Sequence, residues 1–354
     1  MSKSVKKRLS MMLAVIIFLG CVHPTIAKAS TDNTIQNAIL INENGSYSGT
    51  APEEGEVFYR LDLQETGIVT FTLNVFQDNG SDILLYDNGY EKIQGYYAYY
   101  DGNRDCAYKK IKFYLCAGTY YLKLGNLYKN TSYSFSLNFQ KVKESFSESQ
   151  GNRNDILAQA KRISLEKKYY GLIGDGDYQD FYSFNMPFSG NISITHFNYT
   201  EEETGYYEIL NSEGNRVCSF SGDYDHNKGY AYDKDTVELD KGTYYLKVYE
   251  HNGAYKFSIN AKPDEGTVDY GMRSKSKATI RLKKSDDVTG YIVQYSTSDK
   301  FSKKSTKSKN VKGTTVKLSG LSKSKTYYVR VRCYKQWNGK NYYGDFGNTY
   351  TLWP

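Results

Sequence analysis

The strongest constraint on the fold is an internal duplication. The segment from Gly118 to Lys123, Gly-Thr-Tyr-Tyr-Leu-Lys, returns unchanged from Gly242 to Lys247. Each copy leads into a second run in which aromatic or aliphatic residues alternate with polar ones. The offset between copies is 124 residues for the first run and 122 for the second. A repeat this long is a duplicated domain rather than a solenoid unit.

The alternation has a period of two, which is the period of a β-strand. Tyrosine is abundant, at 37 of 354 residues, proline is scarce at 5, and no long stretch has helical periodicity. Short strands separated by turns predict two packed sheets in each copy. We expect the first β-sandwich repeat over residues 30–139, a polar linker over 140–152 and the second repeat over 153–262.

A third unit is expected over residues 265–354. Strands are predicted at Ala278–Lys284, Gly290–Thr297 and Val311–Leu318, and alternation from Tyr327 to Cys333 predicts another. Leu321, six residues before Tyr327, is typical of a tyrosine corner, in which a tyrosine hydroxyl bonds to upstream backbone. The prediction is therefore an all-β chain of three tandem β-sandwich domains.

The residues also resemble two known families. Asn154-Asp155, the run from Asp177 to Phe184 and the Gly242–Lys247 motif resemble the bacterial pre-peptidase C-terminal domain. That family is a jelly-roll-like β-sandwich of secreted proteases, and it includes the collagen-binding domains of bacterial collagenases. The third unit is similar to a fibronectin type III domain, although Ile280-Arg281-Leu282 stands where that family usually has a tryptophan.

The first 29 residues have the pattern of a signal peptide. A basic start precedes an apolar run from Leu9 to Gly20, and Ala27-Lys28-Ala29 supplies a cleavage site. We expect a secreted protein that begins near Ser30, without a transmembrane anchor in the mature chain.

Cys106 and Cys116 flank a predicted strand, which would hold them roughly 30 Å apart, beyond the reach of a disulfide. We therefore expect free thiols there.

Charge is divided unevenly along the chain. Residues 265–354 contain 19 Lys and Arg against 6 Asp and Glu, a net charge of +13. The whole chain has +7 and the leader +5, which leaves −11 for the two repeats. A basic module outside a bacterial cell suits anionic cell-wall polymers, which the lysine run from Lys300 to Lys312 could bind by counterion release, although Ser- and Lys-rich runs are more often solvated loops. No specific nucleic acid partner is expected.

The loop from Gly174 to Asp180 is the best candidate for a metal site. Three carboxylates in a glycine-rich loop offer hard oxygen ligands for Ca²⁺. The resemblance implies that Asn154, Asp155, Asp177 and Asp180 bind calcium, with Asp175 as a further candidate. Asp177 and Asp180 are both expected in a loop outside the core. The alternative is an ordinary solvated turn. In the first repeat Val57 stands where Asp180 does, so no site is expected there.

Two other features of the sequence each allow a functional and a purely structural interpretation. Tyr96, Tyr97, Tyr99 and Tyr100 offer a ligand platform, but tyrosines on the outer face of a sheet give the same pattern. His196, His226 and His251 show no zinc-site spacing and are expected on the surface or in loops.

The sequence thus predicts a secreted protein without a catalytic domain, because the linkers are too short to house one. It would bind extracellular protein or polysaccharide. The alternative is an accessory or remnant of a secreted peptidase system. The residues do not name the ligand.

Overall fold

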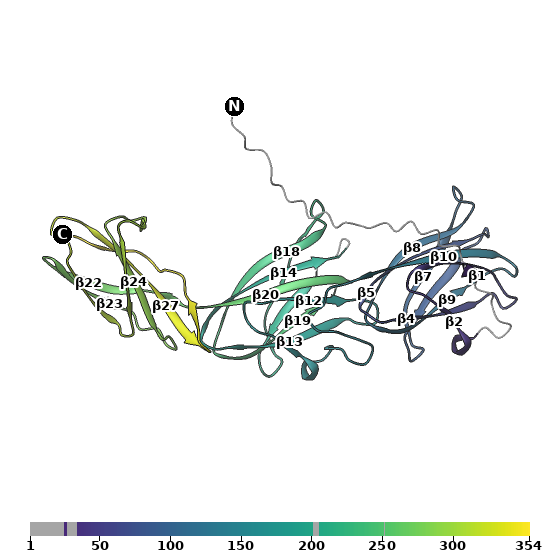
Figure 1. Ribbon diagram of the computed structural model, residues 1–354, viewed down its shortest axis with the longest axis horizontal. Helices are drawn as coiled ribbons and strands as arrows, with labels where there is room; N and C mark the ends of the chain where they lie inside the picture. Colours follow the sequence, from purple (N-terminus) through teal and green to yellow (C-terminus); the bar gives the residue numbers. More distant parts are fainter. Residues whose placement is uncertain (1–24, 27–33, 201–204, 251) are drawn as a thin grey trace, which may run out of the picture.

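The structure is a computed structural model, which describes residues 25–26, 34–200, 205–250 and 252–354. These residues form β-strands and two short 3-10 turns, which confirms the all-β prediction. Figure 1 shows three strand-built bodies in a row, with the first repeat at one end and the C-terminal unit at the other. In the described part of the chain, no helix is long and apolar enough to cross a membrane. Apart from Thr25–Ile26, the predicted signal segment lies outside the described residues.

The first repeat is built from one continuous sheet that folds over itself. Its strands are β1 (Thr25–Ile26), β2 (Ile39–Ile41), β3 (Gly45–Thr50), β4 (Val57–Leu63), β5 (Gly67–Val75), β6 (Ser81–Tyr86), β7 (Lys92–Asp101), β8 (Cys106–Leu115), β9 (Gly118–Gly125) and β10 (Ser132–Lys141). Their order is β1-β3-β10-β5-β8-β7-β6-β9-β4-β2. Strand β7 joins the two layers, because it pairs with β6 along most of its length and with β8 near its end.

The second repeat has two separate five-stranded sheets. One has the order β11-β13-β19-β15-β16 and the other β12-β20-β14-β18-β17. The strands are β11 (Lys161–Arg162), β12 (Lys168–Ile173), β13 (Gln179–Met186), β14 (Gly190–Tyr199), β15 (Tyr206–Leu210), β16 (Arg216–Ser221), β17 (Tyr224–Asp225), β18 (Tyr230–Leu239), β19 (Gly242–Tyr249) and β20 (Gly253–Pro263). The inward residues of both sheets meet in one hydrophobic core.

The duplicated motif has the same role in both repeats. Strand β9 pairs with β4, and its counterpart β19 pairs with β13, antiparallel in each case. A buried pair of tyrosines is also repeated. The hydroxyls of Tyr59 and Tyr133 lie 2.7 Å apart in the first repeat, and those of Tyr182 and Tyr255 lie 2.5 Å apart in the second. Each pair crosses the core, because its two tyrosines come from opposite layers, β4 and β10 in the first repeat and β13 and β20 in the second.

The C-terminal unit contains β21 (Glu265–Gly266), β22 (Val268–Ser274), β23 (Lys277–Leu282), β24 (Gly290–Ser296), β25 (Thr306–Val311), β26 (Thr315–Ser319), β27 (Tyr327–Trp337), β28 (Lys340–Tyr343) and β29 (Tyr350–Leu352). The expected tyrosine corner is present, since the Ser322 amide donates to the Tyr327 hydroxyl at 3.1 Å. The predicted strand Val311–Leu318 is wrong as a single strand. A turn at Gly313 divides it into β25 and β26, so part of the lysine run is an edge strand rather than a loop.

The C-terminal unit is not an isolated body. Tyr342 of β28 is 6% exposed and belongs to the core cluster of the second repeat, where its ring lies 5.4 Å from that of Phe188. Lys262 pairs with Asp345 at 3.0 Å, and Lys340 pairs with Glu166. The second junction therefore combines an aromatic contact with ion pairs.

All four cysteines of the described chain are free, as predicted for Cys106 and Cys116. These two lie at and just beyond the ends of β8, so an extended strand separates them. The remaining two, Cys218 and Cys333, are half-buried and buried, and Cys333 belongs to the core of the C-terminal unit.

His196 departs from the expectation of a surface residue. It lies in β14, is 0% exposed and faces Asp235 at 3.2 Å. Its ring lies 4.2 Å from that of Tyr207. Burial lowers the pKa of His196 below its ordinary value of 6.5, despite the opposing effect of Asp235. The alternation of β14 places it inward, which the search for metal spacing could not show.

This burial predicts a pH-dependent stability. Below about pH 6.5 the unfolded chain takes up a proton on this histidine, whereas the folded chain does so only at lower pH. The free energy of unfolding therefore falls as pH drops from 6.5 toward the lowered pKa. His196→Phe should flatten that part of the curve, measured by chemical denaturation between pH 5 and 8. His226→Phe changes an exposed histidine and should leave the slope unaltered. Equal slopes for wild type and His196→Phe would contradict this account.

Candidate metal centre

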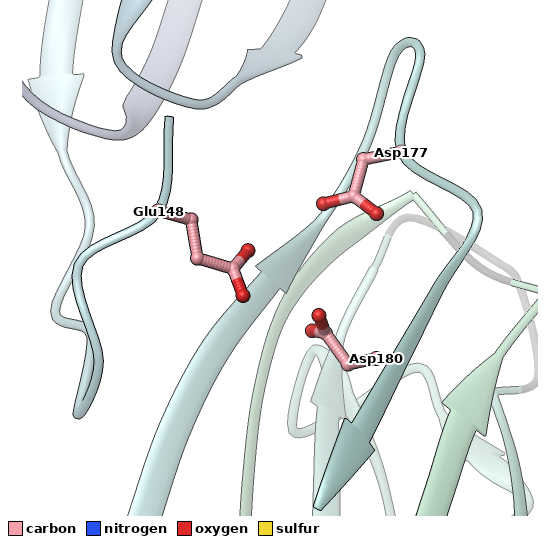
Figure 2. Close-up of side chains that lie close together, drawn as sticks. All are labelled: Glu148, Asp177 and Asp180. Carbon is pink, nitrogen blue, oxygen red and sulfur yellow. The ribbon is translucent and has the colours of Figure 1, made fainter. Parts of the chain in front are cut away.

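Three buried carboxylates converge between the two repeats. One oxygen from each of Glu148, Asp177 and Asp180 lies within 4.8 Å of the others, as Figure 2 shows. The three side chains belong to residues that are only 5%, 5% and 0% exposed. Glu148 comes from the segment between the repeats, Asp177 from the loop after β12, and Asp180 from β13. The cluster therefore joins the connecting segment to the second repeat.

The cluster has more oxygen atoms than hydrogen-bond donors. Among the described residues, five buried side-chain oxygens from this region have no hydrogen-bond partner: Glu148 Oε2, Asn154 Oδ1, Asp155 Oδ1, Asp177 Oδ1 and Asp180 Oδ1. Buried polar atoms in native proteins are nearly always paired, so each orphan needs an explanation. Carboxylate and amide oxygens of this kind are the ligands that a hard cation such as Ca²⁺ prefers.

The raised pKa values of the three carboxyl groups also indicate a cation site. Burial raises the pKa of Glu148 to about 8, with Asp177 adding repulsion. Burial also raises the pKa of Asp177 and Asp180 well above the ordinary value, and neighbouring carboxylates raise both further. Like charges in a low-dielectric site cannot all ionise without compensation. A divalent cation would supply that compensation and restore the charged forms.

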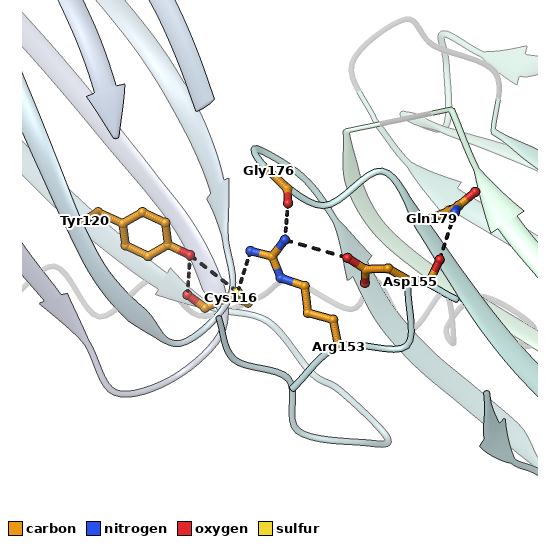
Figure 3. Close-up of polar contacts among 6 residues, drawn as sticks. All are labelled: Cys116, Tyr120, Arg153, Asp155, Gly176 and Gln179. Carbon is orange, nitrogen blue, oxygen red and sulfur yellow. Dashed lines mark hydrogen bonds and ion pairs between the residues drawn. The ribbon is translucent and has the colours of Figure 1, made fainter. Parts of the chain in front are cut away.

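Arg153 supplies part of the positive charge. Its guanidinium Nη1 lies 3.8 Å from Asp155 Oδ2 and donates to the Gly176 carbonyl. On its other side Nη2 donates to Cys116 Sγ of the first repeat at 3.6 Å. Figure 3 shows this arginine between the repeats, next to Cys116, whose carbonyl accepts from the Tyr120 hydroxyl at 2.9 Å. Arg153 thus links the site to the first repeat.

The loop that presents Asp177 is a tight turn. The Gly174 amide donates to the Asp177 carbonyl at 3.1 Å, and the Asp177 amide donates back at 2.9 Å. Gly176 has a φ of +78°, a conformation that favours glycine. A Cβ on Gly174 would lie 2.2 Å from the Tyr114 carbonyl oxygen of the first repeat, so only glycine permits this close contact.

Asp180 is held by the tyrosine pair of the second repeat. The Tyr255 hydroxyl donates to Asp180 Oδ2, while the other oxygen of Asp180 stays among the orphans. The expectation that Asp180 lies in a loop outside the core is wrong, because it lies in β13 and is fully buried. In the first repeat Val57, 0% exposed, takes this position, which explains the absence of a matching carboxylate there.

The structure places the predicted ligands in two groups. Asp177 and Asp180 belong to the cluster, and Asp155 is near enough to raise the pKa of both. The carboxylate of Asp175 instead points to the first repeat. There it accepts from the Tyr114 amide at 2.9 Å and from Gln94 Nε2 at 3.3 Å. The role of Asp175 in this structure is therefore at the interface between repeats.

Glu148 was missed by sequence reasoning. It lies in the segment interpreted as a polar linker, where a Ser- and Glu-rich composition predicts exposure. Only its position in the sequence could have indicated a role in the site, since Glu148 precedes Asn154-Asp155 by only a few residues. Asn154 itself is 0% exposed, with its amide nitrogen donating to the Phe181 carbonyl at 3.1 Å. Its Oδ1 is one of the unpaired buried oxygens of this region.

The tyrosines predicted as a ligand platform do not share one surface. Tyr96 packs against the core of the first repeat, with its ring 5.9 Å from that of Phe113. Tyr97 and Tyr99 contact each other edge to face at 4.9 Å, and Tyr99 is 70% exposed. Tyr100 is also exposed, and its hydroxyl donates to Asp105. Tyr97 and Tyr99 are thus the pair that lies together.

Comparison with known proteins finds relatives of the expected kinds. No family model matches the chain. The chain is 25% identical to collagenase ColA of Clostridium perfringens strain 13 over 257 residues, which is 66% of this chain and 22% of the collagenase. It therefore spans about a fifth of the length of that relative.

Two solved structures are also similar. The pre-peptidase C-terminal domain of a Bacillus anthracis collagenase is 28% identical and aligns over 28% of this chain and 94% of that domain, with a TM-score of 0.23. A two-domain fibronectin type III segment of chicken tenascin is 15% identical and aligns over 49% of this chain and 98% of the segment, with a TM-score of 0.25.

The orphaned oxygens generate a stability prediction. Millimolar calcium should raise the melting temperature of the chain relative to chelator, because a ligand that binds only the folded state stabilises it. At a hundredfold excess over Kd the gain is about 2.7 kcal/mol. Glu148→Gln should reduce this shift strongly. In chelator the same variant should be at least as stable as wild type, since it removes a repelling buried carboxylate.

The melting temperatures in calcium and in chelator are measured by calorimetry. Asp175→Asn is the matched control for both the calcium shift and the stability in chelator. It changes a carboxylate in the same loop, but one that faces the first repeat, so the calcium shift should persist. A melting temperature that is the same in calcium and in chelator would contradict a metal centre. A shift lost equally in Asp175→Asn and Glu148→Gln would instead show that the whole loop is being disrupted.

Proposed function

We propose that this chain is a non-catalytic binding protein that acts outside a bacterial cell. Its repeats would hold an extracellular protein or polysaccharide, and Ca²⁺ bound by Glu148, Asn154, Asp155, Asp177 and Asp180 would fix the connection between them. The observation that supports this most directly is the cluster of orphaned buried oxygens at the junction. A site in that position serves to set the geometry of two modules.

Geometry matters because two linked modules bind one ligand more tightly when their arrangement is already fixed. Ordering the connection before binding removes an entropic cost from the binding step. The first junction already has contacts for this purpose, from Asp175 to Tyr114 and from Arg153 to Cys116. Calcium would add the link through Glu148. The role we assign to calcium is therefore structural.

The similarity to a collagenase suggests the class of protein ligand. That enzyme is named for action on collagen, and this chain corresponds to about a fifth of its length. A chain that corresponds to only this share of a collagenase is consistent with a substrate-binding part that is separate from the catalytic part. Collagen is therefore the first protein ligand to test.

The same proportion supports a second candidate function. A chain similar to one part of a much longer peptidase would also serve as an accessory or remnant of a secreted peptidase system. In that case its partner would be a peptidase rather than a matrix component. The two proposals differ in what the purified chain binds without any enzyme present.

The direct test is co-sedimentation of the full chain with insoluble collagen, in calcium and in chelator. We expect sedimentation with collagen in calcium, several-fold weaker binding in chelator, and no release of collagen peptides. Glu148→Gln should behave in calcium as wild type does in chelator. Release of peptides by the pure chain would contradict a non-catalytic role, and failure to bind collagen or any polysaccharide would favour the accessory role.

The basic C-terminal unit suggests attachment to anionic cell-wall polymer. Lys303, Lys304 and Lys307 are exposed within a unit of net charge +13. Attraction by such a cluster acts over about 8 Å at physiological salt and weakens as salt rises.

Changing these three lysines to serine should therefore lower retention on isolated cell walls at low salt, measured by sedimentation. Lys167→Ser with Lys168→Ser is the control, because these lysines are equally exposed but lie in the second repeat. Retention that is unaffected by the three substitutions and by salt would contradict attachment through the basic unit.

A further inference from the structure

The outer face of one sheet of the second repeat carries a cluster of aromatic rings. Phe197 and Tyr199 come from β14, and Tyr230 and Tyr232 from the adjacent strand β18. The ring of Phe197 lies 4.8 Å from that of Tyr232 and 5.6 Å from that of Tyr230. Tyr199 and Tyr232 remain 41% and 44% exposed. The cluster is therefore an open aromatic surface on the side of the sheet away from the core.

Lys256 of β20 holds these rings in place. Its ammonium lies 3.6 Å from the centre of the Phe197 ring and donates to the Tyr199 hydroxyl at 3.0 Å. Cation–π contact and a hydrogen bond together restrict the rings before any ligand arrives. A prearranged aromatic surface loses little entropy on binding.

The fold does not require this cluster. The first repeat has the same arrangement of strands, and there Asn74 stands where Phe197 does, 123 residues earlier. Asn74 lies opposite Tyr108, whose ring is covered by Arg104 at 4.0 Å. Strand propensity alone therefore does not account for four neighbouring rings in the second repeat.

A groove continues from the rings along the same face. It has a volume of about 810 Å³ and extends from Tyr232 to Asp345 of the C-terminal unit. Besides Tyr232, Lys234 and Lys262, the outward residues along its floor are amides and hydroxyls: Asn191, Ser193, Thr195, Thr236 and Asn260. Strand β14 runs along this face from Asn191, opposite Glu238, to Tyr199, and these eight steps give the face a length of about 26 Å at ~3.3 Å per residue. This is an extended groove suited to a chain rather than a small molecule.

The charges of this face balance. Lys234, Lys256 and Lys262 lie on it or at its rim together with Glu238, Glu265 and Asp345, and Lys262 is paired with Asp345. A ligand with a strong net charge would gain little here. The face therefore favours a neutral ligand.

We propose that this groove binds a neutral polysaccharide, with one sugar ring stacked on the aromatic cluster and the following sugars along the polar floor. Sugar hydroxyls both donate and accept hydrogen bonds, as do the amide and hydroxyl side chains of the floor. Extended proline-rich peptides offer mainly carbonyl acceptors, so they match this floor less well. The inference rests on the proposed binding function and names its ligand class and surface.

The test is native affinity electrophoresis of the full chain in gels that contain soluble β-glucan, xylan, galactomannan or glycogen. We expect at least one of these polysaccharides to retard the chain. Tyr199→Ala combined with Tyr232→Ala should weaken that binding roughly tenfold or more, as loss of central aromatic contacts does. Thr195→Val, which removes one hydroxyl at nearly constant shape, should weaken it several-fold without changing the melting temperature.

Tyr206→Ala is the matched control, because Tyr206 is 38% exposed on the opposite sheet of the same repeat. It should leave retardation unchanged. If no polysaccharide retards the chain, or if retardation survives in the double variant, or if Tyr206→Ala abolishes it, the proposal is overturned. Collagen sedimentation of the same samples distinguishes failure of this inference from failure of the proposed function. A chain that binds collagen but no polysaccharide would support the proposed binding function and contradict the polysaccharide groove.

Discussion

Electrostatic repulsion among buried carboxylates is the interaction on which the first junction depends. Glu148, Asp177 and Asp180 are brought together by three different segments, so their mutual repulsion opposes the fold that places them there. Burying like charges without a partner costs several kcal/mol. Arg153 lies beside Asp155 and offsets part of this repulsion, and the unpaired carboxylate oxygens are ligands that a hard cation would take.

The two repeats share a buried tyrosine pair but differ in the residue that lies beside it. The tyrosine pair across the core is present in both, as Tyr59 with Tyr133 and as Tyr182 with Tyr255. In the second repeat the pair extends to Asp180, whereas in the first repeat Val57 fills the same position with an apolar side chain. The first repeat thus has an apolar side chain at the position where the second repeat contributes Asp180 to the carboxylate cluster.

Much of the fold could be predicted from the sequence because alternation reports directly which face of a strand is buried. The duplicated motif and the tyrosine corner were found this way. Glu148 was not, because a residue in a polar connecting segment becomes buried only through contacts with both repeats. His196 follows the alternation of Ile192 and Ile194, so its burial could be read from the strand pattern, whereas the spacing of the histidines did not indicate it. The division between β25 and β26 depends on the turn at Gly313, which composition alone does not locate within a polar run.

The position of Tyr342 has a consequence for the order in which the chain matures. The core of the second repeat includes this ring, which follows the last strand of that repeat by most of the length of the C-terminal unit. During synthesis, the second repeat therefore emerges with an uncovered apolar site. It reaches its final packing only after nearly the whole polypeptide has appeared, whereas the first repeat has its entire core at hand much earlier. Chaperone dependence and vulnerability to proteases during folding should accordingly be concentrated in the middle of this molecule.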